Sequence, residues 1–192
     1  MPPQPKLTRD TAIAAAVELV RASGLESVNA RSLAARLDTS TKPLFRLYTG
    51  MDELKRHLID ELNVYYNAYM DERMTDGNRL VSQGIAYISF ARTEPHIFNA
   101  LFMNCTMAGS TLQGVSEAEW NRATIENVQA VTGGTDADAR ATFLKVWLFS
   151  HGIATQIVSC EIDIPDDTVA ELVEDAFWRF AQPAPPRKGR TH

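Results

Sequence analysis

The chain has 192 residues, of which 45% are hydrophobic and 22% are charged, a balance typical of globular proteins that bury a core. This composition excludes a disordered, collagenous or fibrous chain, and no apolar run approaches the ~18 residues that a membrane span needs. The net charge of −5 gives no overall attraction to nucleic acid.

Helical periodicity runs from end to end, and no strand pattern stands out. The first 75 residues predict four helices separated by caps and breaks: one from Thr8 or Asp10 to Gly24, a short one capped by Asn29, one from Thr41 to Tyr48 after the turn 38–40, and one from Met51 to about Thr75. No Gly or Pro interrupts the fourth helix, so it is expected to be long.

The remaining sequence predicts further helices bounded by Pro, Gly and capping residues: Arg79 to Ala91, one opening at Pro95, Ser116 to Gly133, Thr135 or Asp136 to Cys160, and Pro165 to just before Pro183. Residues 106–115 predict a loop, and the proline-rich basic tail 183–192 predicts disorder. The expected fold is all-α with about nine helices: an N-terminal head of residues 1–50 and a helical body of residues 51–182, which the long fourth helix joins.

The second and third helices, joined by a short turn, fit a helix-turn-helix DNA reader. Their inner faces carry apolar residues, namely Leu33, Ala34, Leu37, Leu44 and Tyr48. The outer face offers Arg46 to guanine, while Arg31, Lys42 and the hydroxyls of Ser40 and Thr41 suit phosphates. The alternative is a solvated face of an ordinary helix bundle.

The charge distribution supports the DNA reader. Residues 1–56 carry nine Lys/Arg against six Asp/Glu, a net charge of +3, and the other 136 residues carry −8. A basic head on an acidic body is typical of a small DNA-binding domain on a body with another role, although an excess of three charges also arises by chance.

The segment LAARLDTSTKPLFRLYTGMDEL, residues 33–54, resembles the signature of the TetR family of transcriptional repressors. Ala34, Ser40, Leu44 and Leu54 match the family pattern, and other positions carry close substitutes. The resemblance implies a homodimeric repressor of a palindromic double-stranded operator, released by a small-molecule effector. The DNA-binding residues expected on this basis are Arg31, Ser40, Thr41, Lys42, Phe45, Arg46, Tyr48 and Lys55.

Several positions depart from the family pattern. Asp38 replaces the turn glycine, and it tolerates a left-handed backbone less easily than Gly does. Phe45 lacks the hydroxyl of the family tyrosine, and Met51 replaces the usual lysine, so two phosphate contacts are expected to be lost. Lys55 or Arg56, one turn later, could supply a replacement contact.

The last two predicted helices are expected to form the dimer. The penultimate helix is apolar on two sides and therefore needs cover on both, and the last helix has apolar residues at a/d-like spacing. Pairing with the same helices of a second copy would give a four-helix bundle, as the resemblance also implies. The alternative is that both faces are covered within one chain.

Residues 147–152, Trp-Leu-Phe-Ser-His-Gly, resemble a Trp/His/Gly element in the effector domain of one TetR subgroup. His151 would then face a mostly apolar cavity for an apolar effector. Its alternative role is that of a hydrogen-bonded core histidine, just as the aromatic residues could simply be core. The expected cavity residues are Tyr66, Tyr87, Phe98, Phe102, Met103, Trp120, Trp147 and His151.

The sequence shows no motif for catalysis, phosphate binding or metal binding, so no enzyme activity, cofactor or metal is expected. His57 and Glu61, one turn apart, are too few for a metal site. An all-α protein-interaction module that no longer binds DNA is the competing function. Two cysteines, Cys105 and Cys160, give no disulfide framework, and the N-terminus lacks a secretory signal, so a cytoplasmic location away from membranes is predicted.

Overall fold

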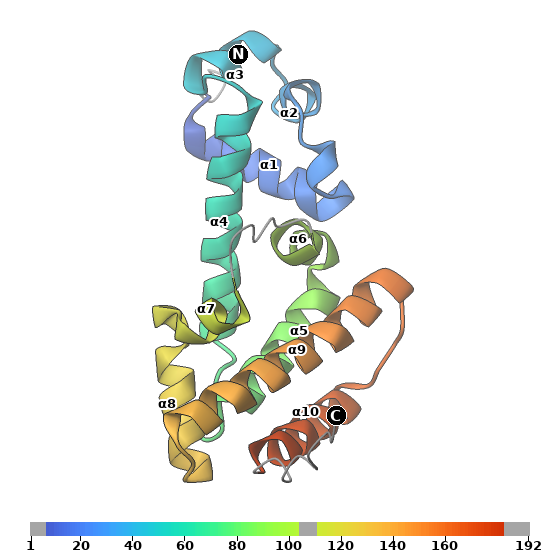
Figure 1. The fold of residues 1–192 in the computed structure, drawn as a ribbon. Coiled ribbons are helices and arrows are strands. Elements are labelled where there is room, and N and C mark those ends of the chain that lie inside the picture. Colours follow the sequence, from blue (N-terminus) through green and yellow to red (C-terminus); the bar gives the residue numbers. More distant parts are fainter. Residues whose placement is uncertain (1–6, 104–110, 183–192) are drawn as a thin grey trace, which may run out of the picture. The chain divides into compact units, whose positions relative to one another are not determined.

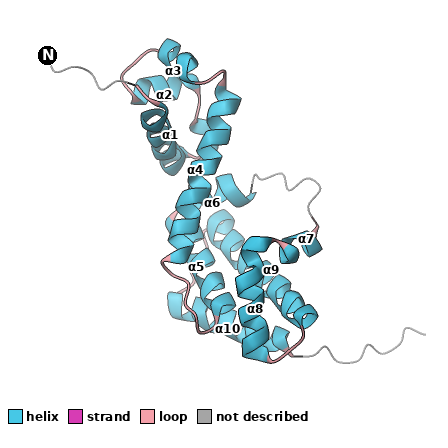
Figure 2. Cartoon of the chain, turned by 90° about the vertical axis from the view of Figure 1, so that its left-hand side faces the viewer, coloured by secondary structure: helices cyan, strands magenta, loops and turns pink. Residues whose placement is uncertain are grey.

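The computed structural model describes residues 7–103 and 111–182, which form ten α-helices, two 3-10 helices and one π-helix but no strand (Figure 1, Figure 2). In chain order they are α1 (Arg9–Ser23), η1 (Leu25–Ser27), α2 (Ala30–Arg36), α3 (Thr41–Leu47), α4 (Met51–Asp71), α5 (Arg79–Thr93), α6 (Pro95–Phe98), η2 (Asn99–Met103), α7 (Leu112–Glu117), η3 (Glu119–Asn121), α8 (Arg122–Thr132), α9 (Asp136–Cys160) and α10 (Asp166–Ala181). The all-α prediction is confirmed. None of these described helices is long and apolar enough to cross a bilayer.

The helices form two compact units, residues 1–69 with 90–106 and residues 70–89 with 107–192. The division falls inside α4 and α5 rather than between helices. The boundary expected at residue 50 concerns function and stays a prediction. The tail 183–192, predicted to be disordered, and Cys105 lie outside the described residues, while Cys160 is an exposed free thiol.

Local caps fix the helices of the first unit. Thr8 begins α1 with a reciprocal capping box in which its hydroxyl accepts a hydrogen bond from the Thr11 amide. Gly24 ends α1 with a φ of +78°, a backbone conformation that a side chain would strain, and its amide donates to the Val20 carbonyl at 2.8 Å. Asn29 caps α2 in the same way as Thr8 caps α1.

Burial organises the rest of the first unit. Helix α1 packs against η1, α2 and α6, and α2 packs against α3. Along α4, Leu54, Leu58 and Leu62 recur every fourth residue and are almost completely buried. The helix ends at Asp71, not near Thr75 as predicted, because the amides of Arg73 and Met74 both turn back to the Met70 carbonyl.

Two predictions between residues 106 and 133 are wrong where the structure describes them. Helix α7 occupies part of the expected loop, and Thr111 caps it by accepting a hydrogen bond from the Gly114 amide at 3.0 Å. Ser116 lies buried inside α7 and does not begin a helix. Extended backbone at Ala118 separates α7 from η3, so the following helix, α8, begins only at Arg122.

The core of the second unit forms where α9 packs against α8, α10 and α7. Phe143 and Val146 of α9 and Val173 and Phe177 of α10 are almost completely buried. Thr135, one of the two residues at which the sequence allowed this helix to start, caps α9 through a capping box with Asp138. The resulting hydrogen bonds lower the pKa of the Asp138 carboxyl.

Gly84 allows α5 to approach α9 and α10 closely. A Cβ atom at this position would lie 2.7 Å from Ser150 Oγ and 3.0 Å from Val173 Cγ1. Ser150 Oγ is buried and has no hydrogen-bond partner among the described residues. The absence of a side chain at Gly84 is therefore a packing requirement.

We expect Gly84→Ala to lower the free energy of unfolding by about 1–3 kcal/mol, because the added methyl group overpacks the contact between α5 and α9. Ser150→Ala removes a hydroxyl without a partner, so it should be nearly neutral and should reduce the cost of Gly84→Ala. Chemical denaturation of the two single variants and the double variant measures both effects. Gly77→Ala, at a glycine with open space around it, is the control, and equal stability of Gly84→Ala and Gly77→Ala would refute the packing requirement.

Candidate functional site

The geometry of α2, the turn and α3 presents one face of α3 to solvent. The Asn29 side chain accepts hydrogen bonds from the amides of Arg31 and Ser32 at 3.0 and 3.1 Å, which fixes the start of α2. Asp38 adopts a φ of +49° in the turn, so this aspartate does take the left-handed conformation of the usual glycine. Ser40 occupies the N-cap position of α3 without a side-chain capping hydrogen bond.

The inner face of α3 is anchored while its outer face is free of core contacts. Leu44 is 2% exposed, whereas Lys42 and Arg46 are exposed and Phe45 is 51% exposed. Of the other predicted DNA contacts, Arg31 and Ser40 are exposed and Thr41 and Lys55 are half-buried. An exposed face with two cations, a hydroxyl and an aromatic ring can contact phosphates and base edges.

Tyr48 lies elsewhere than the predicted interface requires. It is only 2% exposed, its hydroxyl is 2.9 Å from His57 Nδ1, and the Arg9 guanidinium lies 4.6 Å from its ring centroid. Burial raises the pKa of its hydroxyl. The prediction that Tyr48 contacts DNA is at odds with this burial, so we leave Tyr48 out of the interface and treat it as the residue that anchors the end of α3 to α4.

A polar cluster that the sequence did not reveal joins the start of α1 to the start of α4. Glu53 accepts hydrogen bonds from the amide and the hydroxyl of Thr49 at 2.7 and 2.9 Å and from the Arg9 guanidinium at 2.6 Å. These donors, the Thr49 amide first, lower the pKa of the Glu53 carboxyl to about 2. The only sequence signal for this role was an acidic residue in the first turn of a helix.

Part of the predicted effector site forms an aromatic cluster in the first unit. The Tyr66 ring lies edge-on to Phe90 and to Phe102, with centroid distances of 5.1 and 5.0 Å, and Phe98 lies 5.2 Å from Phe102. Desolvation raises the pKa of the Tyr66 hydroxyl far above its usual range. The sequence prediction omitted Phe90, which is fully buried at the centre of this cluster.

The other predicted effector residues belong mostly to the second unit. The Tyr87 hydroxyl lies 2.9 Å from His151 Nδ1, and the Trp147 ring stacks on the imidazole with a centroid distance of 6.3 Å. Burial lowers the pKa of His151, which favours the neutral imidazole at pH 7. His151 is therefore a hydrogen-bonded, partly buried histidine, the alternative that the sequence had left open, and this does not prevent it from contacting a ligand.

Two predicted effector residues lie in exposed positions. Trp120 is 83% exposed on η3, and Met103 is 39% exposed at the end of η2. Neither side chain is enclosed as a cavity wall would be. Two surface grooves lie among the described residues, and none of the predicted effector residues lines either of them. The apolar effector cavity therefore stays a prediction.

Helices α9 and α10 use some of their apolar residues within the chain and expose others. Val169, Val173 and Phe177 of α10 are buried, but Leu148 of α9 and Trp178 of α10 are 47% and 48% exposed. Leu172 of α10 is 39% exposed. Both helices therefore retain apolar surface that the rest of the described chain, residues 7–103 and 111–182, does not cover.

Comparison with known proteins gives a family match over more than half of the chain. The family described as "Tetracyclin repressor-like, C-terminal domain" matches residues 80–179. Over 60 residues, 31% of this chain, the sequence is 40% identical to the HTH-type transcriptional repressor DrrR1 of Streptomyces coeruleorubidus. That match spans 22% of the length of DrrR1.

Solved structures show the same fold. A TetR-like transcriptional regulator from Rhodococcus sp. RHA1 superposes with a TM-score of 0.64 over 91% of this chain and 96% of that chain, at 18% identity. A member of the TetR family from Streptomyces coelicolor A3 superposes with a TM-score of 0.57 over 88% and 96%, at 14% identity. At these identities the likeness concerns the fold.

The Glu53 cluster predicts a pH dependence of stability. Because its pKa is about 4.3 when unfolded and about 2 when folded, the Glu53 carboxylate stabilises the fold fully above pH ~4.3 and loses this contribution as the pH falls through about 2. We expect Glu53→Gln to lower the melting temperature at pH 7 and to match the wild type near pH 2. Thermal unfolding followed by circular dichroism between pH 2 and 7 measures the difference, and a difference that does not change with pH would contradict the prediction.

Proposed function

Since the chain belongs to the tetracycline repressor-like (TetR) family of transcriptional regulators, we propose that it is a homodimeric repressor that binds a palindromic operator and leaves it when a small apolar effector binds. Family members are regulators, not enzymes, and TetR-type regulators bind operator DNA and effectors and form dimers. The observation that carries the proposal is the exposed face of α3. Leu44, buried on the opposite face, holds the helix in place.

In the proposed complex, α3 lies in the major groove of the operator. Arg46 donates to the O6 and N7 atoms of guanine, and the exposed Phe45 ring suits the methyl group of a thymine. Lys42, Arg31 and the hydroxyls of Ser40 and Thr41 contact phosphates. Lys55 on α4 replaces the phosphate contact that Met51 does not provide.

We assign DNA reading to residues 1–50 and effector binding and dimerisation to residues 51–182. The exposed apolar residues Leu148, Leu172 and Trp178 support a dimer through α9 and α10, because pairing with a second copy would remove them from water. Two symmetry-related heads would then read two half-sites about one helical turn apart. A DNA-binding regulator acts where the genome is, which supports a cytoplasmic location.

The effector is proposed to contact Tyr87, Trp147 and His151 of the second unit. The Tyr87–His151 pair offers one hydrogen-bonding group beside the indole of Trp147, which suits a mostly apolar molecule with a single polar group. An effector that binds one conformation of α4 better than another would shift the spacing of the two heads, and the size of this effect equals its differential affinity for the two conformations.

The proposal predicts that Lys42→Ala and Arg46→Ala weaken binding to duplex DNA. Lys42→Ala removes a phosphate contact, so it should reduce the slope of log affinity against log salt by about one. Arg46→Ala should lose about 1–3 kcal/mol of discrimination between operator and unrelated DNA. Fluorescence anisotropy with labelled duplexes measures both effects. The titrations cover salt concentrations of about 0.05–0.3 M, a range over which added salt strongly weakens phosphate contacts.

Arg122→Ala is the matched control, since Arg122 is an exposed base on α8 in the other unit. It should leave both the affinity and the salt slope unchanged. If Lys42→Ala behaved like Arg122→Ala, α3 would not be the DNA-reading helix. If the wild type bound no DNA at low salt, the protein-interaction module would replace the repressor as the proposed function.

A further inference from the structure

A cluster of one arginine, one glutamate and one tyrosine, the Glu94 cluster, joins three helices of the first unit. Glu94, the N-cap residue of α6, accepts hydrogen bonds from Arg21 Nε, 3.2 Å from each carboxylate oxygen, and from the Tyr65 hydroxyl at 2.8 Å. Arg21 Nη2 lies 3.0 Å from one of these oxygens, and the guanidinium lies 4.8 Å from the Tyr65 ring centroid. Arg21 belongs to the last turn of α1 and Tyr65 to α4, so a single carboxylate holds α1, α4 and α6 together. The proposed DNA contacts use none of these three side chains.

The surroundings of Glu94 fix its position. Its side chain is 16% exposed, so water screens its pairing with Arg21 less than it screens a surface ion pair. Its amide donates to the Phe90 carbonyl at 2.9 Å, and its carbonyl accepts from the Phe98 amide at 2.8 Å. Phe90 and Phe98 are fully buried, so the backbone that carries Glu94 is fixed to the core. Burial, followed by the hydrogen bond and charge of Glu94, raises the pKa of the Tyr65 hydroxyl, which therefore stays protonated as a donor.

The Glu53 cluster, at the opposite end of α1, has the same composition. There the Arg9 guanidinium pairs with Glu53 and lies over the Tyr48 ring. Arg9 and Arg21 are twelve residues apart on α1, about 18 Å along its axis. Glu53 and Tyr65 are separated by the same number of residues on α4. Helices held at one point can pivot about it, whereas helices held at two points keep their angle, so the angle between α1 and α4 depends on both clusters.

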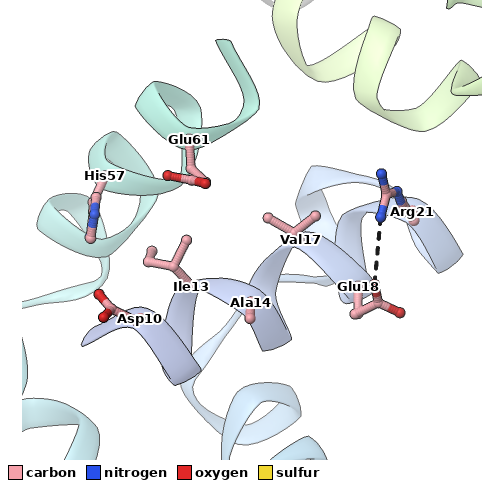
Figure 3. Close-up of a pocket in the computed structure, with 8 residues that line it drawn as sticks. All are labelled: Asp10, Ile13, Ala14, Val17, Glu18, Arg21, His57 and Glu61. Carbon is pink, nitrogen blue, oxygen red and sulfur yellow. Dashed lines mark ion pairs between the residues drawn. The ribbon is translucent and has the colours of Figure 1, made fainter. Parts of the chain in front are cut away.

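Glu18 is a second partner of Arg21, but it lies on α1 itself (Figure 3). The two side chains are 3.6 Å apart, and 51% of the Glu18 side chain is exposed. Glu18 also lies 3.6 Å from the exposed Arg36 of α2. Exposed pairs at this distance contribute little to stability, and neither of these two joins α1 to α4 or α6. The contact that fixes the end of α1 is therefore the one with Glu94.

We propose that Glu94 is a positioning residue for operator binding, an inference that rests on the proposed function. By holding Arg21 against Tyr65, its carboxylate fixes the angle between α1 and α4. Helix α1 packs against α2, and α2 packs against α3, so this angle sets the direction in which α3 presents its exposed face. In a dimer, a fixed direction gives a fixed spacing of the two heads, which an operator with two half-sites requires. Binding to unrelated DNA through phosphate contacts does not require it.

The test uses the full-length chain, the operator that the wild type selects from random duplexes, and a scrambled duplex of equal length. Glu94→Gln keeps the shape of the side chain and removes its charge. We expect it to lower operator affinity about tenfold, the usual size of a coupling effect. Affinity for the scrambled duplex should change less than about twofold, because the phosphate contacts remain. Fluorescence anisotropy at one salt concentration measures the ratio of the two affinities.

Two further measurements separate positioning from stability. Tyr65→Phe removes only the hydroxyl and keeps the ring beneath Arg21, so it should lower the affinity ratio in the same direction with little effect on folding. An operator with one base pair inserted between its half-sites should be rejected less strongly by Glu94→Gln than by the wild type, because the heads no longer hold one spacing.

Two variants are controls. Glu18→Gln removes the exposed carboxylate that also contacts Arg21, and it should keep the wild-type ratio. Arg140→Ala removes an ion pair with Asp136 in the second unit, so it lowers stability without touching the Glu94 cluster and should also keep the ratio. Circular dichroism and the melting temperature establish that each variant is folded during the titrations.

The inference is overturned if Glu94→Gln keeps the wild-type ratio, or if Arg140→Ala lowers the ratio as much as Glu94→Gln does. It is also overturned if Glu94→Gln weakens binding to the operator and to the scrambled duplex equally. In these three cases the wild type still binds its operator, so the proposed function stands. A wild type that binds no DNA at low salt overturns the proposed function, and the inference with it.

Discussion

The burial of Leu44 and Tyr48 is the constraint on which the N-terminal unit depends. Helix α3 has seven residues, and a helix of that length is not stable alone in water, since isolated helices shorter than about 12–15 residues are marginal. Its conformation therefore depends on the burial of Leu44, within the helix, and of Tyr48, its C-cap residue. The same two contacts decide which residues of α3 remain on the surface.

Several polar contacts support this anchor from neighbouring helices. His57 holds the Tyr48 hydroxyl, Arg9 lies over the Tyr48 ring, and Glu53 joins Arg9 to Thr49 at the start of α4. A movement of α4 would therefore displace α3, because Tyr48 connects the two helices. This connection is the physical basis for the proposal that a conformational change in α4 alters DNA binding.

Local chemistry explains why much of the fold was predictable. Asn29 caps α2 as predicted, and Thr8 and Thr135 cap α1 and α9, each being one of two residues predicted for that position. These caps were predictable because a side chain three residues from its partner acts within one helical turn. Gly24 ended α1 for an equally local reason. The start of α8 was missed because Ala118, where the helix breaks, carries no breaking signal of its own.

The site was less predictable because burial depends on distant residues. The burial of Tyr48, the exposure of Trp120 and the pairing of Tyr87 with His151 are set by packing between separate helices, and no spacing in the sequence encodes them. Periodicity gave the faces of the helices correctly at Leu33 and Leu44. It did not point to Phe90, whose ring contact with Tyr66 depends on packing between residues far apart in the sequence.

The most direct test of the central claim is selection of the purified protein against a pool of random duplex DNA, with sequencing of the retained molecules. The account predicts enrichment of a palindrome whose half-sites lie about one helical turn apart, and loss of that enrichment in Arg46→Ala. Absence of any enriched sequence from a folded, dimeric protein would contradict it and would favour the protein-interaction module.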